Sequence, residues 1–245
     1  MTKLAATEYI NRRHALLKNL PQGAVVMVQC APVYIRNGDV EHDYRQDSSF
    51  YYLSGMVESH ATLVLANGAN GPCSTLFCTS KNKLQEIWHG RRLGVDAAPH
   101  VLMIDQAYSN ENMADKLIEL LDDASQVVYS FSRADTGELV QQSLSKLRSL
   151  ARQGKTCPTQ LVDLDPLVDA MRLLKSAAEV DQMAAACEIS VAAHKRAMSL
   201  CRVGMHEYQL AAELHHQFST QGSRRVAYGS IVAGGENACI LHYTN

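Results

Sequence analysis

Apolar runs and apolar stripes succeed one another along the first 174 residues in an order that predicts a mixed sheet covered by helices. Residues 24–30 hold too little polarity to face water on either side, which predicts a central strand. We expect further strands at 50–53, 62–66, 75–78, 126–131 and 160–162, and helices at 7–20, 111–121, 135–152 and 166–174. Thr7 is predicted to cap the first of these helices and Asp165 the last. Strands that come first and then alternate with helices predict an α/β sandwich with a mixed sheet.

The strongest helical pattern begins at Ser176, which with Glu179 forms a capping-box sequence. A stripe at helical spacing follows: Val180, Met183, Ala184, Cys187, Val191, His194, Met198 and Cys201. A second helix is predicted at 207–221, with Leu210, Leu214 and Phe218 on one side. We place a domain junction just before this helix pair, so that residues 1–174 form one domain and residues 175–245 begin another.

The last eighteen residues predict two strands around a turn. Apolar residues 230–233 and 238–241 flank a Gly-Gly-Glu-Asn segment at 234–237, which is a turn sequence. His242 follows the second predicted strand, and Tyr228 precedes the first. An imidazole near neutral pH can donate, accept or bind a metal, so this strand pair is a candidate site.

Composition narrows the class of protein. Hydrophobic residues make up 47% of the 245 residues and charged residues 20%, as in ordinary globular proteins. A net charge of −2 gives no strong attraction to nucleic acid or to an anionic membrane, and no stretch reaches the roughly 18 apolar residues of a membrane span. The seven cysteines are odd in number and scattered, which favours reduced thiols in a cytoplasmic protein over a disulfide framework.

Few residues qualify for chemistry on spacing alone. Phosphate-binding, dinucleotide-binding, zinc-protease and paired-cysteine motifs do not occur in the sequence. His194 lies on the apolar stripe and is interpreted as a hydrogen-bonded core histidine. Asp39 lies in a charged loop, and the spacing of the acidic residues there does not indicate a catalytic role. A single tryptophan such as Trp88 is more often a core anchor, although charged residues surround this one. Tyr228 and His242 remain as the candidates.

Four segments carry a specific resemblance: Y-R-Q-D-S-S-F-Y-Y-L-S-G (44–55), E-I-W-H-G-R-R-L-G-V-D-A-A-P (86–99), M-R-L-L-K-S-A-A-E-V (171–180) and G-E-N-A-C-I-L-H-Y-T-N (235–245). Together and in this order they resemble bacterial aminopeptidase P, the Xaa-Pro aminopeptidase. The resemblance implies an N-terminal α/β domain of the creatinase and aminopeptidase P type, followed by the beginning of a pita-bread α+β catalytic domain. It also implies two manganese ions in the full-length parent, a peptide substrate with proline at the second position, and a homo-oligomer, either tetramer or dimer.

The resemblance also assigns roles to individual residues. It makes His242 a catalytic residue that hydrogen-bonds near the scissile peptide, and Tyr228 a residue lining the substrate site. Trp88 matches a tryptophan near the entrance of that site, and Asp39 an acidic residue that reaches toward a neighbouring subunit. The metal ligands of the family follow the segment that matches His242, so no metal ligand is assigned and no metal is expected on this chain.

Two expectations follow for the 245 residues themselves. We expect the chain to be inactive alone and its activity to belong to a longer parent; the alternative is a non-catalytic binding or oligomerisation protein on the same scaffold. A weaker alternative is a relative of creatinase or prolidase. We also expect the apolar stripe after Ser176 to be exposed or covered by another copy of the chain, which makes residues 176–245 the labile part and lets residues 1–174 fold alone.

Overall fold

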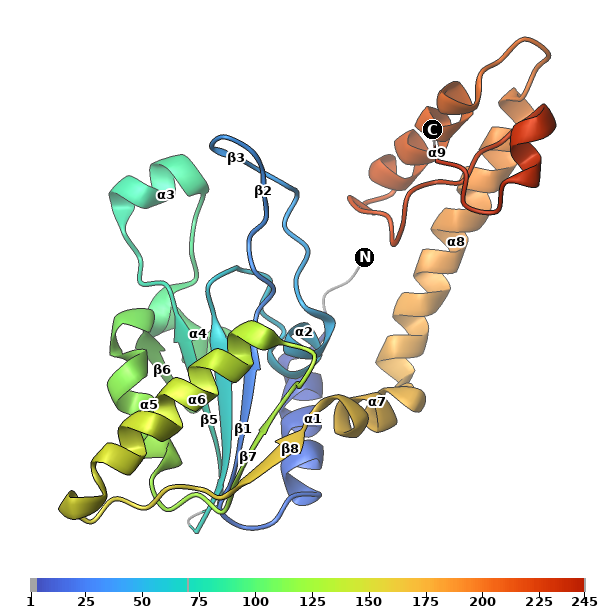
Figure 1. Cartoon of the computed structure of the whole chain (residues 1–245). Coiled ribbons are helices and arrows are strands. Elements are labelled where there is room, and N and C mark those ends of the chain that lie inside the picture. The colour runs from blue at the N-terminus through green and yellow to red at the C-terminus, as the bar shows by residue number, and fades with distance from the viewer. Residues whose placement is uncertain (1–3, 70, 245) are drawn as a thin grey trace. The chain divides into compact units, whose positions relative to one another are not determined.

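The computed structural model describes residues 4–69 and 71–244, which form two compact units. The first unit runs from Leu4 to Leu174, and the second begins at Lys175. Figure 1 shows the first unit in blue to yellow and the second in orange to red.

A six-stranded mixed sheet forms the centre of the first unit, in the order β6-β5-β4-β1-β7-β8. The strands are β1 (Ala24–Gln29), β4 (Thr62–Gly68), β5 (Gly71–Cys78), β6 (Gln106–Ser109), β7 (Gln126–Tyr129) and β8 (Gln160–Asp163). β4 runs antiparallel to both of its neighbours, and the remaining pairs are parallel. β1 is an interior strand whose Val26 lies between Leu65 and Val128, so the prediction of a central strand at 24–30 and of a mixed sheet is confirmed.

Helices cover both faces of this sheet (Figure 1). One face packs against α1 (Ala6–Lys18), α2 (Ser48–Ser54), α4 (Gly94–Leu102) and α7 (Asp165–Leu173), and the other against α5 (Met113–Leu121) and α6 (Ala134–Ser149). Successive residues of β1 divide between the two cores: Val26 and Val28 belong to the first, Val25 and Met27 to the second. This alternation follows from the two-residue period of a strand. Short 3₁₀ helices at η1 (Asn110–Asn112) and η2 (Ala151–Gln153) complete the connections.

The predicted strand at 50–53 is wrong, because these residues lie in helix α2. The Asp47 side chain accepts a hydrogen bond from the Phe50 amide at 2.8 Å, which caps the first turn. Gly55 ends the helix in the left-handed region, at φ 70°. Phe50 and Leu53 are three residues apart and therefore face the core together.

Two predicted helix caps also differ in the structure. Thr7 lies inside α1, which Ala5 precedes, and Asp165 is the first residue of α7, so that Leu164 holds the capping position. Helix α4 and strand β6 were not predicted, because their four to nine residues carry no long periodic pattern.

Two elements project beyond one edge of the sheet: the hairpin of β2 (Ile35–Asn37) with β3 (Val40–Glu41), and helix α3 (Lys83–His89) (Figure 1). The hairpin follows β1 and α3 follows β5 along the chain. β1 and β5 are both antiparallel to β4 and so run in the same direction. Their carboxyl ends therefore deliver both elements to the same edge.

The second unit is built on the helix pair α8 (Ala177–Leu200) and α9 (Glu207–Thr220). The predicted capping box is confirmed: the Ser176 side chain accepts from the Glu179 amide at 3.3 Å, and the Glu179 carboxylate accepts from the Ser176 amide at 2.8 Å. Arg196 on α8 joins Glu213 on α9 through an ion pair of 2.6 Å. The face of α8 that this packing buries consists of Ile189, Ala193 and Ala197. The predicted stripe lies on another face and is exposed.

The predicted strands at 230–233 and 238–241 are wrong. Residues 223–234 adopt no regular structure, and Gly235–Cys239 forms the 3₁₀ helix η3. A strand needs a neighbouring strand to accept its backbone hydrogen bonds, and the described residues of the second unit contain none. Separately, none of the helices formed by residues 4–69 and 71–244 is long and apolar enough to span a membrane.

Candidate functional site

Tyr228 lies at a cavity of about 490 Å³ in the second unit. α8 contributes Ile189 and His194 to the lining, α9 contributes Leu214 and Phe218, and the irregular segment from Ser223 to Ile231 closes the remaining side. Tyr228 is 75% exposed. Both sides of the cavity mix apolar and polar side chains: α8 carries Ser190 and His194 beside Ile189, and the irregular segment carries Arg225 beside Val226. A concave site with a few polar groups among apolar ones is typical of small-molecule binding.

His194 is placed differently from the prediction. The residue is exposed rather than buried in a core, and its Nδ1 lies 2.8 Å from the Ser190 carbonyl oxygen one turn earlier. The prediction failed because the stripe containing His194 is not the face that packs on α9. Together with Tyr228, His194 supplies an aromatic and ionisable rim to the cavity.

His242 lies in an exposed turn after η3 and does not line the cavity. The backbone segments of the two predicted residues are neighbours nonetheless, because a Cβ atom built on Gly229 would lie 3.7 Å from Cγ2 of Thr244. In the part of the chain that the structure describes, no hydrogen bond or ring contact joins Tyr228 to His242. The structure thus brings the two segments together without a hydrogen bond or ring contact between the two side chains.

Glu207, the first residue of α9, anchors the terminal segment. Its Oε1 accepts from the Asn237 side-chain amide at 2.9 Å and from the Gly234 amide at 3.2 Å. The hydrogen bond from Asn237, supported by the backbone amides, lowers the pKa of the Glu207 carboxyl. The backbone amide of Gly234 and the side-chain amide of Asn237 therefore hold the segment 234–237 against Glu207. Nothing in the local sequence of α9 indicated that Glu207 has this role.

Asp39 and Trp88 lie on the two elements that project from the same edge of the sheet in the first unit. Asp39 follows Gly38, which is in the left-handed region at φ 57°, and forms the turn of the β2–β3 hairpin. Trp88 is 85% exposed on α3, a helix without a buried residue, so it is not a core anchor. The Asn82 side chain caps α3 by accepting from the Leu84 amide at 3.0 Å. Both predicted residues are thus presented to solvent at one edge.

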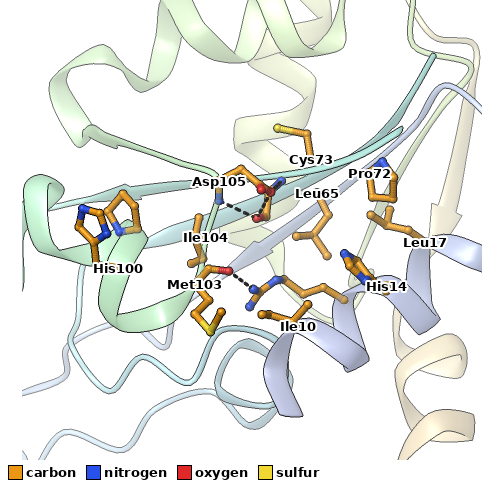
Figure 2. Close-up of a pocket in the computed structure, with 13 residues that line it drawn as sticks. Ile10, His14, Leu17, Leu65, Pro72, Cys73, His100, Met103, Ile104 and Asp105 are labelled. Carbon is orange, nitrogen blue, oxygen red and sulfur yellow. Dashed lines mark hydrogen bonds between the residues drawn. The ribbon is translucent and has the colours of Figure 1, made fainter. Parts of the chain in front are cut away.

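Sequence reasoning did not find a second cavity, of about 430 Å³, between α1, β5 and α4 (Figure 2). Arg13 is only 3% exposed there, and its guanidinium donates to the carbonyl oxygens of Leu53, at 3.0 Å, and Met103. Burial lowers the pKa of Arg13, although the charge of Asp105 opposes this shift. Both carbonyls lie at helix C-termini, whose dipoles compensate a buried cation. Arg13 therefore has a structural role: its hydrogen bonds link α1 to the C-terminal ends of α2 and α4.

Asp105 is tied to strand β5 at the same cavity (Figure 2). Its Oδ2 accepts from the Ser74 hydroxyl at 2.6 Å and from the Ser74 amide at 2.7 Å. Burial raises the pKa of the neighbouring Cys73 thiol, and the charge of Asp105 raises it further. The lining residues extend from Ile10 to Asp105, 95 positions apart along the chain, so no local sequence signal could have revealed the cavity.

Comparison with known proteins supplies the family. Residues 9–129 match the family described as aminopeptidase P, N-terminal domain, and residues 181–245 match metallopeptidase family M24. The Xaa-Pro aminopeptidase of Escherichia coli strain K12 is 40% identical over 248 residues, covering all of this chain. The Xaa-Pro aminopeptidase of Haemophilus influenzae is 33% identical over 244 residues.

Solved structures agree with these matches. The structure of aminopeptidase P from E. coli with the inhibitor Pro-Leu superposes with a TM-score of 0.96 at 39% identity, covering 99% of this chain. That of Pseudomonas aeruginosa aminopeptidase PepP gives 0.97 at 42% identity, covering 100%. The chain belongs to the aminopeptidase P family. The first unit is the N-terminal α/β domain of this family, and the second unit corresponds to the beginning of its metallopeptidase domain.

The chain spans about half the length of these aminopeptidase P relatives: 56% of the E. coli enzyme, 54% of the H. influenzae enzyme and 55% of the solved P. aeruginosa chain. Membership in the M24 metallopeptidases implies a divalent metal ion. Within residues 4–69 and 71–244, no group of three or more His, Cys, Asp or Glu side chains is arranged to hold one. The donor set that a hydrolytic metal requires is thus not assembled by the described residues.

Proposed function

We propose that this chain supplies the N-terminal domain and the first part of the catalytic domain of a cytoplasmic Xaa-Pro aminopeptidase. The reaction is the metal-dependent release of the first residue from a peptide with proline in the second position. The observation that carries the proposal is the 40% identity to an Xaa-Pro aminopeptidase over the whole chain, with both domain matches in the family's order. We further propose a pair of manganese ions in the full-length enzyme and assembly as a homotetramer or homodimer.

The residues of this chain would act on the substrate side. His242 would donate a hydrogen bond near the scissile peptide, and Tyr228 would line the binding site; exposure of both side chains supports these roles. Trp88 would stand at the entrance, and Asp39 would reach toward a neighbouring subunit. Their position on elements that project from one edge of the sheet is what an entrance and a subunit contact require.

Activity would need residues besides those described here, because the metal ligands of the family follow the segment that matches His242. We therefore expect the chain alone to release no amino acid from a proline-containing peptide. Supplying the remainder of the catalytic domain as a second polypeptide, taken from the E. coli relative beyond the matched 56%, is expected to restore release.

The test is incubation with Mn²⁺ and a tripeptide carrying proline second, assayed by release of the free first residue, for each polypeptide alone and for the two mixed. Release on mixing that falls with His242→Ala, and less with the matched exposed control His216→Ala, supports the proposal. Release by the chain alone at an enzyme-like rate would refute the expected inactivity. Association of the two polypeptides without any release would favour the alternative, a non-catalytic binding protein on this scaffold.

A further inference from the structure

The cavity between α1, β5 and α4 is lined by a buried cation whose partners in the described part of the chain are uncharged. Arg13 is 3% exposed, and its guanidinium donates to the carbonyl oxygens of Leu53 and Met103. Within residues 4–69 and 71–244, no carboxylate lies within 4.0 Å of this guanidinium. A guanidinium has more N–H donors than these two bonds use, and a buried cation without a counter-charge is unfavourable. Arg13 therefore offers donors and positive charge to a molecule in the cavity.

A carboxylate lines the same cavity and is also incompletely paired. Asp105 is exposed, and its Oδ2 accepts from the Ser74 amide and hydroxyl. No described residue donates a hydrogen bond to its Oδ1. Burial lowers the pKa of Arg13 and the charge of Asp105 opposes this shift, so the two charges act on each other although no ion pair joins them. Opposite charges thus line one cavity without satisfying each other.

Apolar side chains make up much of the remaining lining. α1 contributes Ile10 and Leu17, and β4 contributes Leu65. In Figure 2, Leu65 is seen between Asp105 and the α1 residue Ile10. The volume of about 430 Å³ falls within the roughly 300–1,000 Å³ of small-molecule sites and is far above the roughly 30 Å³ that one water molecule takes. The cavity therefore suits a small molecule with an apolar body and charges of both signs.

Every lining residue lies in the N-terminal domain of the family. The lining extends from Ile10 to Asp105, inside the match to the aminopeptidase P N-terminal domain at residues 9–129. None of these residues belongs to the metallopeptidase domain, of which the chain spans only the first part. The cavity is thus formed within the first unit.

We propose that this cavity binds a free α-amino acid with an apolar side chain, its carboxylate on Arg13 and its ammonium group on Asp105. One α-carbon joins the two charged groups of such a molecule, so a single small ligand reaches both partners. Hydrogen bonds between a guanidinium and a carboxylate are stronger than those to neutral carbonyls. The side chain of the amino acid would lie against Ile10 and Leu65. This site requires neither a metal ion nor peptidase activity, so it stands apart from the proposed function.

Ligands with one charge fit this lining less well. A carboxylate without an ammonium group brings a second negative charge toward Asp105, and an amine without a carboxylate brings a second positive charge toward Arg13. The zwitterion pairs both groups.

Calorimetric titration of the 245-residue chain tests this ligand chemistry with molecules of one shape. L-Leucine is expected to bind saturably. 4-Methylpentanoate, which is leucine without its ammonium group, and 3-methylbutylamine, which is leucine without its carboxylate, are each expected to bind about tenfold more weakly, because each leaves one charged group unpaired. If either analogue binds as tightly as L-leucine, or if L-leucine shows no saturable binding, the proposal is overturned.

Nuclear magnetic resonance of the isotope-labelled chain locates the bound molecule. The Ser74 amide donates to Asp105 at the cavity, and the Gly234 amide donates to Glu207 in the second unit. L-Leucine is expected to shift the Ser74 resonance progressively until saturation and to leave the Gly234 resonance in place. A shift of Gly234 without a shift of Ser74 would place the amino acid in the second unit and overturn the proposal.

A substitution at Asp105 separates the ammonium contact from the shape of the cavity. Asp105→Asn keeps an oxygen that can accept from Ser74 and removes the negative charge. In a variant whose circular dichroism matches wild type, L-leucine is expected to bind about tenfold more weakly and 4-methylpentanoate no more weakly than before. Asp43→Asn, at an exposed position that does not line the cavity, is the matched control and should change neither. Undiminished binding of L-leucine, or an equal loss for both ligands, would overturn the proposal.

Discussion

At the scale of single residues, the position that ends α2 requires glycine for two reasons: its backbone conformation is left-handed, and a side chain there would collide with a neighbouring ring. Gly55 has φ 70°, and a Cβ atom there would lie 2.7 Å from Cε2 of the Tyr9 ring. Gly154 has φ 84°, and its Cβ atom would meet no described atom within 4 Å. Gly154→Ala should therefore cost only the left-handed strain, about 1 kcal/mol.

Gly55→Ala should cost that strain and about 1–3 kcal/mol more, because the buried Tyr9 ring must move. Urea unfolding of both variants measures the difference in the free energy of unfolding. Equal losses in the two variants would mean that the Tyr9 ring relaxes freely and that space does not limit this position.

A second residue-scale prediction concerns pH. The Arg133 side chain contacts Asp135 at 2.5 Å, and this hydrogen bond lowers the pKa of the Asp135 carboxyl. A folded pKa below the unfolded value gives stability that is present above the ordinary pKa of about 4 and is lost as the pH falls through the folded value. The Asp135 side chain is 49% exposed, so solvent screening keeps the effect to about 0.5 kcal/mol.

We therefore expect Asp135→Asn to be less stable than wild type at pH 7 and to converge with it near pH 2, by urea unfolding across that range. Asp43→Asn, at an exposed position in the loop before α2, serves as the control and should differ little from wild type at either pH. A constant gap between the Asp135→Asn variant and wild type over the whole range would show that the ion pair does not shift the pKa of Asp135.

At the scale of elements, α2 depends on Asp47 in two separable ways. One carboxylate oxygen accepts from the Phe50 amide, and the other lies 3.6 Å from Nη1 of Arg133. Asp47→Asn can keep the cap while losing the charge pair, whereas Asp47→Ala loses both. We expect Asp47→Ala to lose about 1–2 kcal/mol of unfolding free energy and Asp47→Asn less than half of that.

Hydrogen exchange of the Phe50 amide localises the effect, since only Asp47→Ala should accelerate it strongly. If both variants exchange at the same raised rate, the charge pair with Arg133 rather than the cap holds the first turn of α2.

The same element shows how far the sequence predicts the fold. The local sequence alone predicts β1, because a short run such as A-V-V-M-V is typical of a buried strand. The start of α8 is also predicted locally, by its capping box. In F-Y-Y-L the aromatic residues favoured a strand, and the structure follows instead the Asp47 cap and the left-handed Gly55. At 230–241 the pattern was that of strands, but strand formation depends on a partner, and within the described residues the Gly234 amide bonds Glu207 instead.

At the scale of the whole molecule, some candidate sites lie within one short stretch of sequence, and others are formed by residues that are far apart along the chain. Tyr228 and His242 could be named from one short stretch and a resemblance, and both are exposed in the structure. Contacts such as Asp105 with Ser74, 31 positions apart, depend on which strands become neighbours. The edge shared by Asp39 and Trp88 likewise follows from β1 and β5 running in the same direction, a property of the sheet order rather than of either segment.

The division into two units predicts unequal resistance to proteolysis. The first unit has two apolar cores around its sheet, whereas α8 buries only Ile189, Ala193 and Ala197 and α9 buries no residue fully. Leu174, at the boundary, is 85% exposed. A segment with little buried apolar area opens at a small cost in free energy and is cut first.

Brief digestion with chymotrypsin is therefore expected to cut near Leu174 and within residues 175–244 before it cuts the first unit. The fragment ending near Leu174 should still unfold in one cooperative transition, which circular dichroism during heating measures. Early cuts inside α5 or α6 would show that the first unit is not the more resistant of the two. A gradual loss of signal from the fragment would show that the first unit needs the second to fold.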